Sequence, residues 1–518
     1  MSPARYSGIL LHPTSLPGPH GAGDLGPAAY HFVDWLAAGK QTLWQVLPLG
    51  EIGPGHSPYM SPSAFAGNVL LIDLAQLQRN GWLDADDLVP DPGFSAKSVD
   101  YPRVLAYRHA RLARAASRFF AGPSATDLDR FNQFCWQMQG WLDDYALFMA
   151  LDRQHRGEGR VWQDWAPALV RREHAALVDV AESLAAECSA WKFAQWCFHE
   201  QWAQLKAYAN SRGVRIVGDM PIYVSPHSAD VWARPALFQL GADFRPSAVA
   251  GVPPDYFSAT GQHWGNPLYD WPAHAAEGYR WWIERLRHML TLCDFVRIDH
   301  FRGFESGWAI PADADAAVDG QWQAGPGEAL FSAVYASLEC SPDDEGGLPI
   351  IAEDLGVITP AVTALRKATG LPGMRILQFA FDGDATNTYL PHNFEADTVV
   401  YTGTHDNDTS FGWWQGLPAE TQDYIRRYLS ANGQSIHWDL IHAASASVAR
   451  MAIIPMQDVL GLDTNARMNQ PGVEEGAWRW RFQWEQVEAW HAEHLADLSQ
   501  LYGRWPDLER DARERMTA

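Results

Sequence analysis

Eight times along this chain a short apolar run ends in polar residues, and this repetition constrains the fold more than any other feature. Amphipathic helical patterns precede several of the runs, for example at 280–292 and 360–369. Strands that alternate with helices pair in parallel, and eight of them favour a closed barrel over an open sheet. The sequence therefore predicts an α/β fold, a (β/α)8 (TIM) barrel with inserted subdomains. The runs are Gly8–His12, Trp44–Pro48, Arg215–Asp219, Asp294–Asp299, Ile350–Glu353, Arg375–Phe379, Thr398–His405 and Ala452–Asp458.

The spacing of the runs predicts one catalytic barrel over residues 1–518 with two insertions. Residues from about 54 to 200, after the second strand, include apolar positions spaced as one helix face, so we expect a mainly helical insertion. Residues from about 225 to 275, after the third strand, are rich in Pro, Gly, Tyr and Trp without clear periodicity, and we expect an irregular substrate loop. The apolar helix face comprises Leu128, Phe131, Cys135, Met138, Leu142, Tyr145 and Met149.

The overall charge excludes some classes of partner. Asp and Glu number 62 against 39 Lys and Arg, which gives a formal charge of −23 and argues against binding nucleic acid or an anionic membrane. The five cysteines form no C-x-x-C pair, so neither a disulfide framework nor a cysteine zinc site is expected. No apolar stretch resembles a signal peptide or a membrane helix. We therefore expect a cytoplasmic protein, either a monomer or a weak homo-oligomer.

Polar residues at the carboxyl ends of the predicted strands are candidates for catalysis, because barrel enzymes place their active sites there. The alternative for some of them is a structural role as caps of the following helices. The residues in these positions are His12, Asp219, Asp299, Glu353, His405, Asp406 and Asp458.

Two carboxylates on neighbouring strands suggest glycoside chemistry. Arg297 and Asp299 share a strand face, and a guanidinium beside a carboxylate keeps it ionised and able to act as a nucleophile. Glu353 ends the next strand, roughly 4.8 Å away, so the ~5–5.5 Å carboxyl separation of a retaining glycosidase is within reach. Asp406 supplies a third carboxylate. A purely structural Arg297–Asp299 salt bridge remains the alternative interpretation.

Nucleotide and metal chemistry are less well supported. Gly21–Gly26 matches G-x-G-x-x-G but lies too far after the first strand for a dinucleotide site. A metal-dependent hydrolase needs several converging histidines, whereas His300 should face away from Asp299 if the strand is regular. We therefore expect neither a metal nor an organic cofactor.

Aromatic residues could supply stacking surfaces for a sugar. The chain has 25 tryptophans, most of which we expect in the core. Tyr256, Phe257 and Trp264 lie in the irregular segment, where they are placed to stack on the apolar faces of sugar rings.

The sequence closely resembles the amylomaltases, or 4-α-glucanotransferases, of the α-amylase clan from about residue 8 to 485. Compared with hydrolytic members of the clan, Asp219 is followed by Met-Pro-Ile-Tyr instead of Asn-His, which favours the transferase branch. One departure is Ala477, which stands where the family usually has Asn before Trp-x-Trp-Arg, with Glu474-Glu475 preceding it. The motifs that carry the resemblance are Ser15–Gly26, Ser57–Tyr59, Ser63–Asn68, Gly218–Val224, Gly251–Ser258, Gly261–Pro267, Arg297–Gly303, Ala352–Gly356, Gly403–Asn407 and Arg467–Gly472.

This resemblance implies a transferase that moves α-1,4-glucanyl segments from a maltodextrin donor to the 4-hydroxyl of glucose or a maltooligosaccharide acceptor. It implies that Asp299 is the nucleophile, Glu353 the general acid/base and Asp406 the transition-state stabiliser. It also implies a set of substrate-binding residues, namely Ser57, Tyr59, Asp219, Tyr256, Phe257, Gln262, Trp264, Arg297, His300, His405 and Asn469. The alternatives are a retaining hydrolase of the same clan, a noncatalytic glucan-binding protein and a metallohydrolase.

Overall fold

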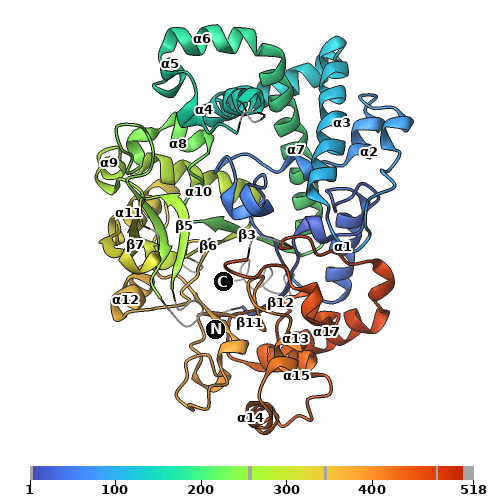
Figure 1. The fold of residues 1–518 in the computed structure, drawn as a ribbon. Coiled ribbons are helices and arrows are strands. Elements are labelled where there is room, and N and C mark those ends of the chain that lie inside the picture. Colours follow the sequence, from blue (N-terminus) through green and yellow to red (C-terminus); the bar gives the residue numbers. More distant parts are fainter. Residues whose placement is uncertain are drawn as a thin grey trace.

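The computed structural model describes residues 4–155, 157, 159–254, 260–314, 316–342, 347–473 and 476–505. Its central feature is an eight-stranded parallel sheet with the order β10-β11-β12-β1-β2-β3-β6-β9 (Figure 1). The amide of Ala352 donates to the carbonyl of Pro372 over 3.0 Å, so β9 lies beside β10 and the sheet curls into a barrel. The predicted (β/α)8 barrel is therefore confirmed. The strands are β1 Tyr6–Leu10, β2 Leu43–Gln45, β3 Arg215–Pro221, β6 Phe295–Asp299, β9 Ile350–Ala352, β10 Gly373–Ile376, β11 Thr398–Tyr401 and β12 Met451–Pro455.

Two of the predicted runs end in helical turns. Residues 377–379 form a 3-10 turn after β10, and α16 (Met456–Val459) follows β12 directly. Asp458 therefore lies in a short helix, where its side chain accepts from the Ser410 amide over 2.7 Å at the start of α13 (Ser410–Gly416). The alternatives considered for Asp458 were catalysis and a cap of the following helix; its carboxylate instead binds the N-terminus of α13, a helix that precedes it in the chain.

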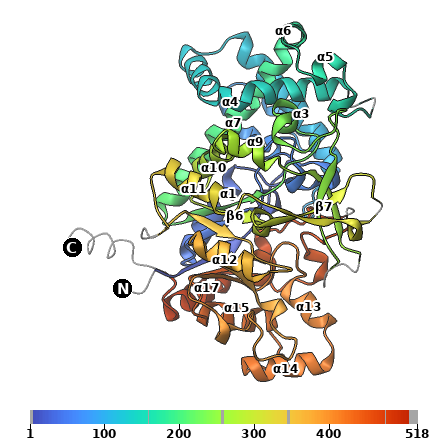
Figure 2. The same cartoon turned by 90° about the vertical axis from the view of Figure 1, so that its left-hand side faces the viewer.

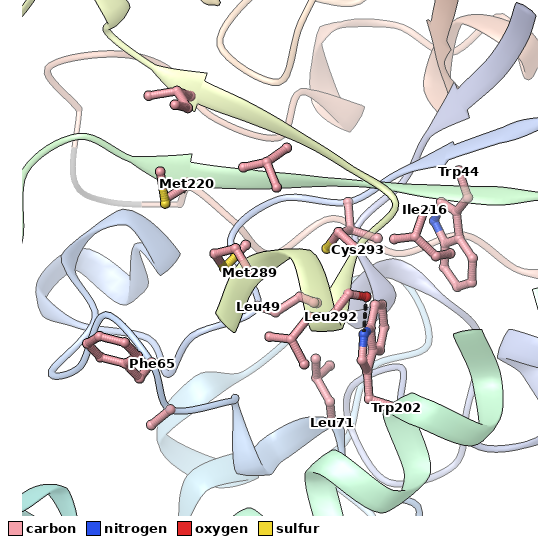
Figure 3. Packing of buried hydrophobic residues seen from close by; sticks show 14 of the residues in the cluster. Trp44, Leu49, Phe65, Leu71, Trp202, Ile216, Met220, Met289, Leu292 and Cys293 are labelled. Atoms are coloured by element: carbon pink, nitrogen blue, oxygen red, sulfur yellow. Dashed lines mark hydrogen bonds between the residues drawn. The ribbon is translucent and has the colours of Figure 1, made fainter. Parts of the chain in front are cut away.

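The barrel strands pack against the surrounding helices through a continuous apolar core (Figure 3). Trp202 of α7 (Ala185–Ser211) donates its indole N–H to the carbonyl of Leu292, the last residue of α10 (Arg280–Leu292), over 2.8 Å. A Cβ at Gly218 would lie 2.4 Å from the sulfur of Cys293. A glycine is therefore needed where β3 meets the end of α10.

The chain between β2 and β3 is rich in helices, and these gather on one side of the barrel (Figures 1 and 2). Of the predicted apolar face, Phe131, Leu142, Tyr145 and Met149 are buried in α4, whereas Leu128 near the start of the helix is exposed. The α-helices in this part of the chain are α2 Leu74–Arg79, α3 Tyr101–Ala121, α4 Ala125–His155, α5 Pro167–Val170, α6 His174–Ser183 and α7.

A second, antiparallel sheet has the order β5-β4-β7-β8. The expectation that 225–275 is irregular needs correction, because this segment contains α8 (Ala229–Ala233), β4 (Ala248–Val252), β5 (Gln262–Pro267) and α9 (Trp271–Ala276). The local sequence hides these strands, because β5 contains Gly265, Asn266 and Pro267, residue types that are depleted in strands, and β4 pairs with β7 from outside the segment. The remaining strands of this sheet are β7 Ser306–Pro311 and β8 Gln321–Ala324.

The remaining longer helices cover other parts of the barrel, and α13, α14 and α15 lie on the side opposite α4 to α6 (Figure 2). Across the described residues, no helix is both long and apolar enough to cross a membrane. These helices are α1 Pro27–Ala38, α11 Glu328–Leu338, α12 Pro360–Ala368, α14 Ala419–Leu429, α15 Ile436–Ala446 and α17 Ala489–Leu501.

Candidate active site

Arg297 is the centre of a buried charge cluster at the carboxyl ends of β3 and β6. Its Nη1 donates to both carboxylate oxygens of Asp219, over 2.7 and 2.8 Å, and its Nη2 donates to Oδ1 of Asp299 over 2.9 Å. Tyr59 donates its hydroxyl to Asp219 over 2.7 Å. Asp219 and Arg297 are almost fully buried, whereas the Asp299 side chain is 28% exposed. Asp299 is thus a fixed carboxylate with an accessible surface.

Glu353 follows β9 and is held by main-chain donors. Its Oε2 accepts from the amide of His300 over 2.6 Å, and its Oε1 accepts from the amide of Leu355 over 2.7 Å. Burial and the charge of Asp299 raise the pKa of Glu353 to about 8, although Arg297 and the two amides oppose this shift. Glu353 is therefore protonated at neutral pH, as a general acid must be.

The two carboxyl groups differ in their contact with Arg297. Burial raises the pKa of Asp299 above its ordinary value, and the Arg297 guanidinium opposes that shift. The guanidinium donates a hydrogen bond to Asp299, whereas the hydrogen bonds to Glu353 come from two main-chain amides. A single proton in this pair therefore resides on Glu353, which leaves Asp299 as the carboxylate. Such a division is the arrangement that a retaining glycosidase mechanism uses.

Asp406 follows β11 and is oriented by its neighbours. Asn469 donates its side-chain amide to Oδ1 of Asp406 over 2.6 Å, and the Nε2 of His405 lies 3.4 Å from Oδ2. Arg467 donates to the main-chain carbonyls of Asp406 and Asn469. The Asp406 side chain is 41% exposed, so its carboxylate remains available to a ligand.

An aromatic wall adjoins the charge cluster. The ring of Tyr59 stacks on His405 with centroids 5.2 Å apart, and Trp478 contacts both rings at 5.7 and 5.8 Å. The Trp478 amide donates to the carbonyl of Met468 over 2.7 Å, and the Trp478 carbonyl accepts from Tyr101 over 2.8 Å. Both main-chain groups of Trp478, next to the departure at Ala477, are thus hydrogen-bonded. Glu474 and Glu475 lie outside the described residues.

His300 does not continue the strand. β6 ends at Asp299, and His300 adopts a left-handed conformation with φ of 53°. We expected His300 to face away from Asp299 if the strand were regular. The strand ends before His300, so that expectation does not apply. Its ring packs edge-on against Trp264 at 4.8 Å, and Trp264 donates its indole N–H to Gln262 over 3.1 Å. Gln262 and Trp264 thereby lie next to the backbone that positions Glu353.

Other predicted substrate-binding residues have less direct positions. Ser57 accepts the Tyr59 amide over 3.2 Å and so caps the 3-10 turn that carries Tyr59. Tyr256 and Phe257 lie outside the described residues. His12 is buried among the residues that line a cavity together with His405 and Arg467. No metal-binding group of three or more His, Cys, Asp or Glu side chains occurs within the described part of the chain.

Sequence reasoning missed four contributors to this site. The amides of His300 and Leu355 left no signal, because main-chain donors are set by backbone conformation and any residue type can supply them. Arg467 and Trp478 lie in motifs that the resemblance includes, yet no role was predicted for them. The signal that could have identified these two residues was the charged side chain of Arg467 and the aromatic side chain of Trp478, both near the end of the chain.

Comparisons with known proteins agree with this geometry. The family model described as 4-alpha-glucanotransferase (glycoside hydrolase family 77) matches residues 11–487. The 4-alpha-glucanotransferase of Synechocystis sp. is 47% identical over 96% of this chain and 98% of its own length, and that of Thermus thermophilus is 46% identical over 96% and 99%. A structure of amylomaltase from Streptococcus agalactiae in complex with acarbose superposes with a TM-score of 0.92 at 39% identity, covering 96% of this chain and 99% of that one. The chain therefore belongs to the 4-alpha-glucanotransferase family.

Proposed function

We propose that this enzyme catalyses a retaining transglycosylation with Asp299 as nucleophile, Glu353 as general acid/base and Asp406 as transition-state stabiliser. The donor is a maltodextrin or starch-type α-1,4-glucan, and the acceptor is the 4-hydroxyl of glucose or of a maltooligosaccharide. The observation that carries the proposal is the unequal environment of the two carboxyl groups: Asp299 accepts a hydrogen bond from Arg297, whereas Glu353 is buried and accepts from two main-chain amides.

In the first step, Asp299 attacks the anomeric carbon while Glu353 protonates the departing glycosidic oxygen. One C–O bond forms as the other breaks, which leaves a glucanyl ester on Asp299 and a carboxylate on Glu353. Asp406, oriented by Asn469, supports the positive charge that develops on the sugar ring.

In the second step, Glu353 removes the proton from an acceptor hydroxyl, which then attacks the ester. Two inversions at the anomeric carbon restore the α configuration. We propose that Ser57, Tyr59, Asp219, Arg297, His300, His405 and Asn469 position the sugars, and that Gln262, Trp264, Tyr256 and Phe257 help to favour an acceptor sugar over water. This chemistry requires neither a metal nor an organic cofactor.

The division of the chain and its setting are also proposals. We propose a single catalytic barrel over residues 1–518, with a mainly helical insertion at about 54–200 and a substrate-binding insertion at about 225–275. We further propose a cytoplasmic monomer or weak homo-oligomer. All five cysteines are free thiols, which suits a reducing compartment.

Maltotriose separates this function from its alternatives. We expect the enzyme to yield glucose and a ladder of longer maltooligosaccharides while the number of reducing ends stays nearly constant. A hydrolase would raise reducing ends with each bond cleaved, and a noncatalytic binding protein would leave maltotriose unchanged. Loss of activity in EDTA, with recovery on adding a divalent ion, would indicate a metallohydrolase.

A matched pair of variants tests the assignment of the nucleophile. Asp299→Asn should abolish redistribution of maltotriose. Asp294→Asn is the control, since Asp294 immediately precedes the same strand at its opposite end and its carboxylate accepts the Ile216 amide over 2.7 Å. Substantial redistribution by Asp299→Asn would remove Asp299 from the mechanism.

A further inference from the structure

Trp322 is an exposed indole on the edge of the second sheet. It belongs to β8, an edge strand whose four residues are all exposed, and Trp322 itself is 42% exposed. Tryptophan is enriched at binding surfaces because its large ring is apolar and its N–H is polar. Single exposed apolar side chains are common on protein surfaces, so the case for Trp322 rests on the contacts around it.

The structure holds this indole in a fixed position. Trp308 pairs with Trp322 across β7 and β8, and their rings meet edge-on with centroids 5.0 Å apart. Trp308 is itself fixed by its N–H, which donates to the carbonyl of Ala317 over 2.7 Å. The buried guanidinium of Arg302 lies over the Trp322 ring at 3.7 Å. With these surfaces covered, the rest of the indole faces solvent in one orientation.

Arg302 connects this indole to the catalytic region. Its guanidinium donates to the carbonyl of Val357, in the loop that follows Glu353, and to the hydroxyl of Ser306 over 3.2 Å. Val357 is 46% exposed. The Ser306 hydroxyl in turn donates to the partly exposed carboxylate of Glu305 over 2.6 Å. An apolar surface and a hydrogen-bond acceptor thus lie together beside the loop that carries the general acid.

The same sheet also reaches the predicted substrate-binding residues. Its opposite edge strand, β5, carries Gln262 and Trp264, next to His300. Three strand spacings of about 4.8 Å separate β5 from β8, or about 14 Å in total. The register pairs Trp322 with Trp308, then with Gly251 and His263, so Trp322 lies on the opposite face of the sheet from Trp264. Trp322 is therefore outside the catalytic centre, and Val357 links it to the loop that follows Glu353.

We propose that Trp322, Val357 and Glu305 form a distal binding platform for long α-1,4-glucans. The indole offers its free surface to the apolar C–H face of a glucose ring, and the Glu305 carboxylate accepts a hydrogen bond from a sugar hydroxyl. The inference rests on the proposed function, because that function supplies the glucan. The platform binds long chains while short substrates bypass it.

The test compares Trp322→Ala with the unmodified enzyme on maltoheptaose and maltotriose. Loss of one aromatic contact should raise KM for maltoheptaose about threefold to tenfold. Both kcat values and the KM for maltotriose should stay unchanged. Trp322→Phe should recover most of the maltoheptaose affinity, since a phenyl ring still stacks. Trp136→Ala is the control, because Trp136 is a 69% exposed tryptophan on α4.

The outcomes separate the platform from the proposed function. Unchanged kinetics of Trp322→Ala on both substrates would overturn the platform while leaving the function intact. Equal losses on maltotriose and maltoheptaose would also overturn it, since they would indicate a structural role. If the unmodified enzyme failed to redistribute maltotriose, the proposed function itself would fail.

Discussion

Nη2 of Arg297 lies 2.9 Å from Oδ1 of Asp299, while Nη1 of the same guanidinium is bound to Asp219. One planar group thus fixes two carboxylates in a largely buried setting. A lysine ammonium is a point charge and does not reproduce this fork. The hydrogen bond from Arg297 therefore fixes the proposed nucleophile, Asp299, in position.

Arg297→Lys should lower kcat/KM on maltotriose by roughly 100-fold or more, which corresponds to about 2.7 kcal/mol of transition-state stabilisation. One of the two carboxylates would lose its partner, and Asp299 would lose its fixed position. Steady-state kinetics checks this, with Arg375→Lys as the control, since Arg375 lies on β10 and pairs only loosely with Asp354 at 3.6 Å. Activity of Arg297→Lys within a few-fold of the unmodified enzyme would contradict the role given to the fork.

The protonation state of Glu353 predicts an alkaline limit. Its pKa of about 8 means that kcat/KM should stay near its maximum below that pH and fall above it, because the first step needs the acid form. A pH–rate profile on maltotriose measures this alkaline limb, the fall in kcat/KM above pH ~8. Residual activity of Glu353→Gln should lack it, because glutamine does not titrate. An alkaline limb that persists in Glu353→Gln would assign the titration to another group.

Asn469 is predicted to act through Asp406. Asn469→Ala removes a hydrogen bond to a carboxylate, a contact worth about 1.5–3 kcal/mol, so kcat should fall roughly 10- to 100-fold with a smaller change in KM. The family resemblance implies a direct substrate contact for this residue. A rise in KM with kcat unchanged would support that simpler role and contradict positioning through Asp406.

Buried histidines predict a loss of stability in acid. Burial lowers the pKa of His288 to about 4 and that of His300 to about 3, below their unfolded value of about 6.5. Between each folded-state pKa and about 6.5, the unfolded chain binds more protons than the folded chain. The stability that comes from keeping these histidines neutral is therefore fully present above pH ~6.5 and is lost as pH falls through about 4. Thermal unfolding from pH 7 to pH 4 should show Tm falling across this window.

A variant that lacks His288 provides the control for the acid effect. His288→Phe should reduce the slope of unfolding free energy against pH by up to one proton, about 1.4 kcal/mol per pH unit. His288 donates its Nε2 proton to the Phe65 carbonyl over 2.8 Å, so the variant also lowers stability at neutral pH. A slope identical to that of the unmodified chain would show that His288 is not kept neutral.

The barrel was predictable because each strand is buried on both faces and so forms a near-continuous apolar run. Asp299 and Glu353 were predictable because they follow such runs directly. Strands β4 and β5 were not, because β5 is an edge strand paired with β4, and the other partner of β4, strand β7, lies more than 35 residues beyond β5. The left-handed conformation of His300 was likewise hidden, although it aims an amide at Glu353.

The covalent intermediate tests the central claim most directly. Glu353→Gln should react with α-maltosyl fluoride, because fluoride departs without a general acid, and should then hydrolyse or transfer the ester slowly because the base is missing. Intact mass spectrometry should show the added mass of one maltosyl unit, and peptide mapping should place it on Asp299. An adduct on another residue, or turnover of the fluoride with inversion and no adduct, would contradict the account.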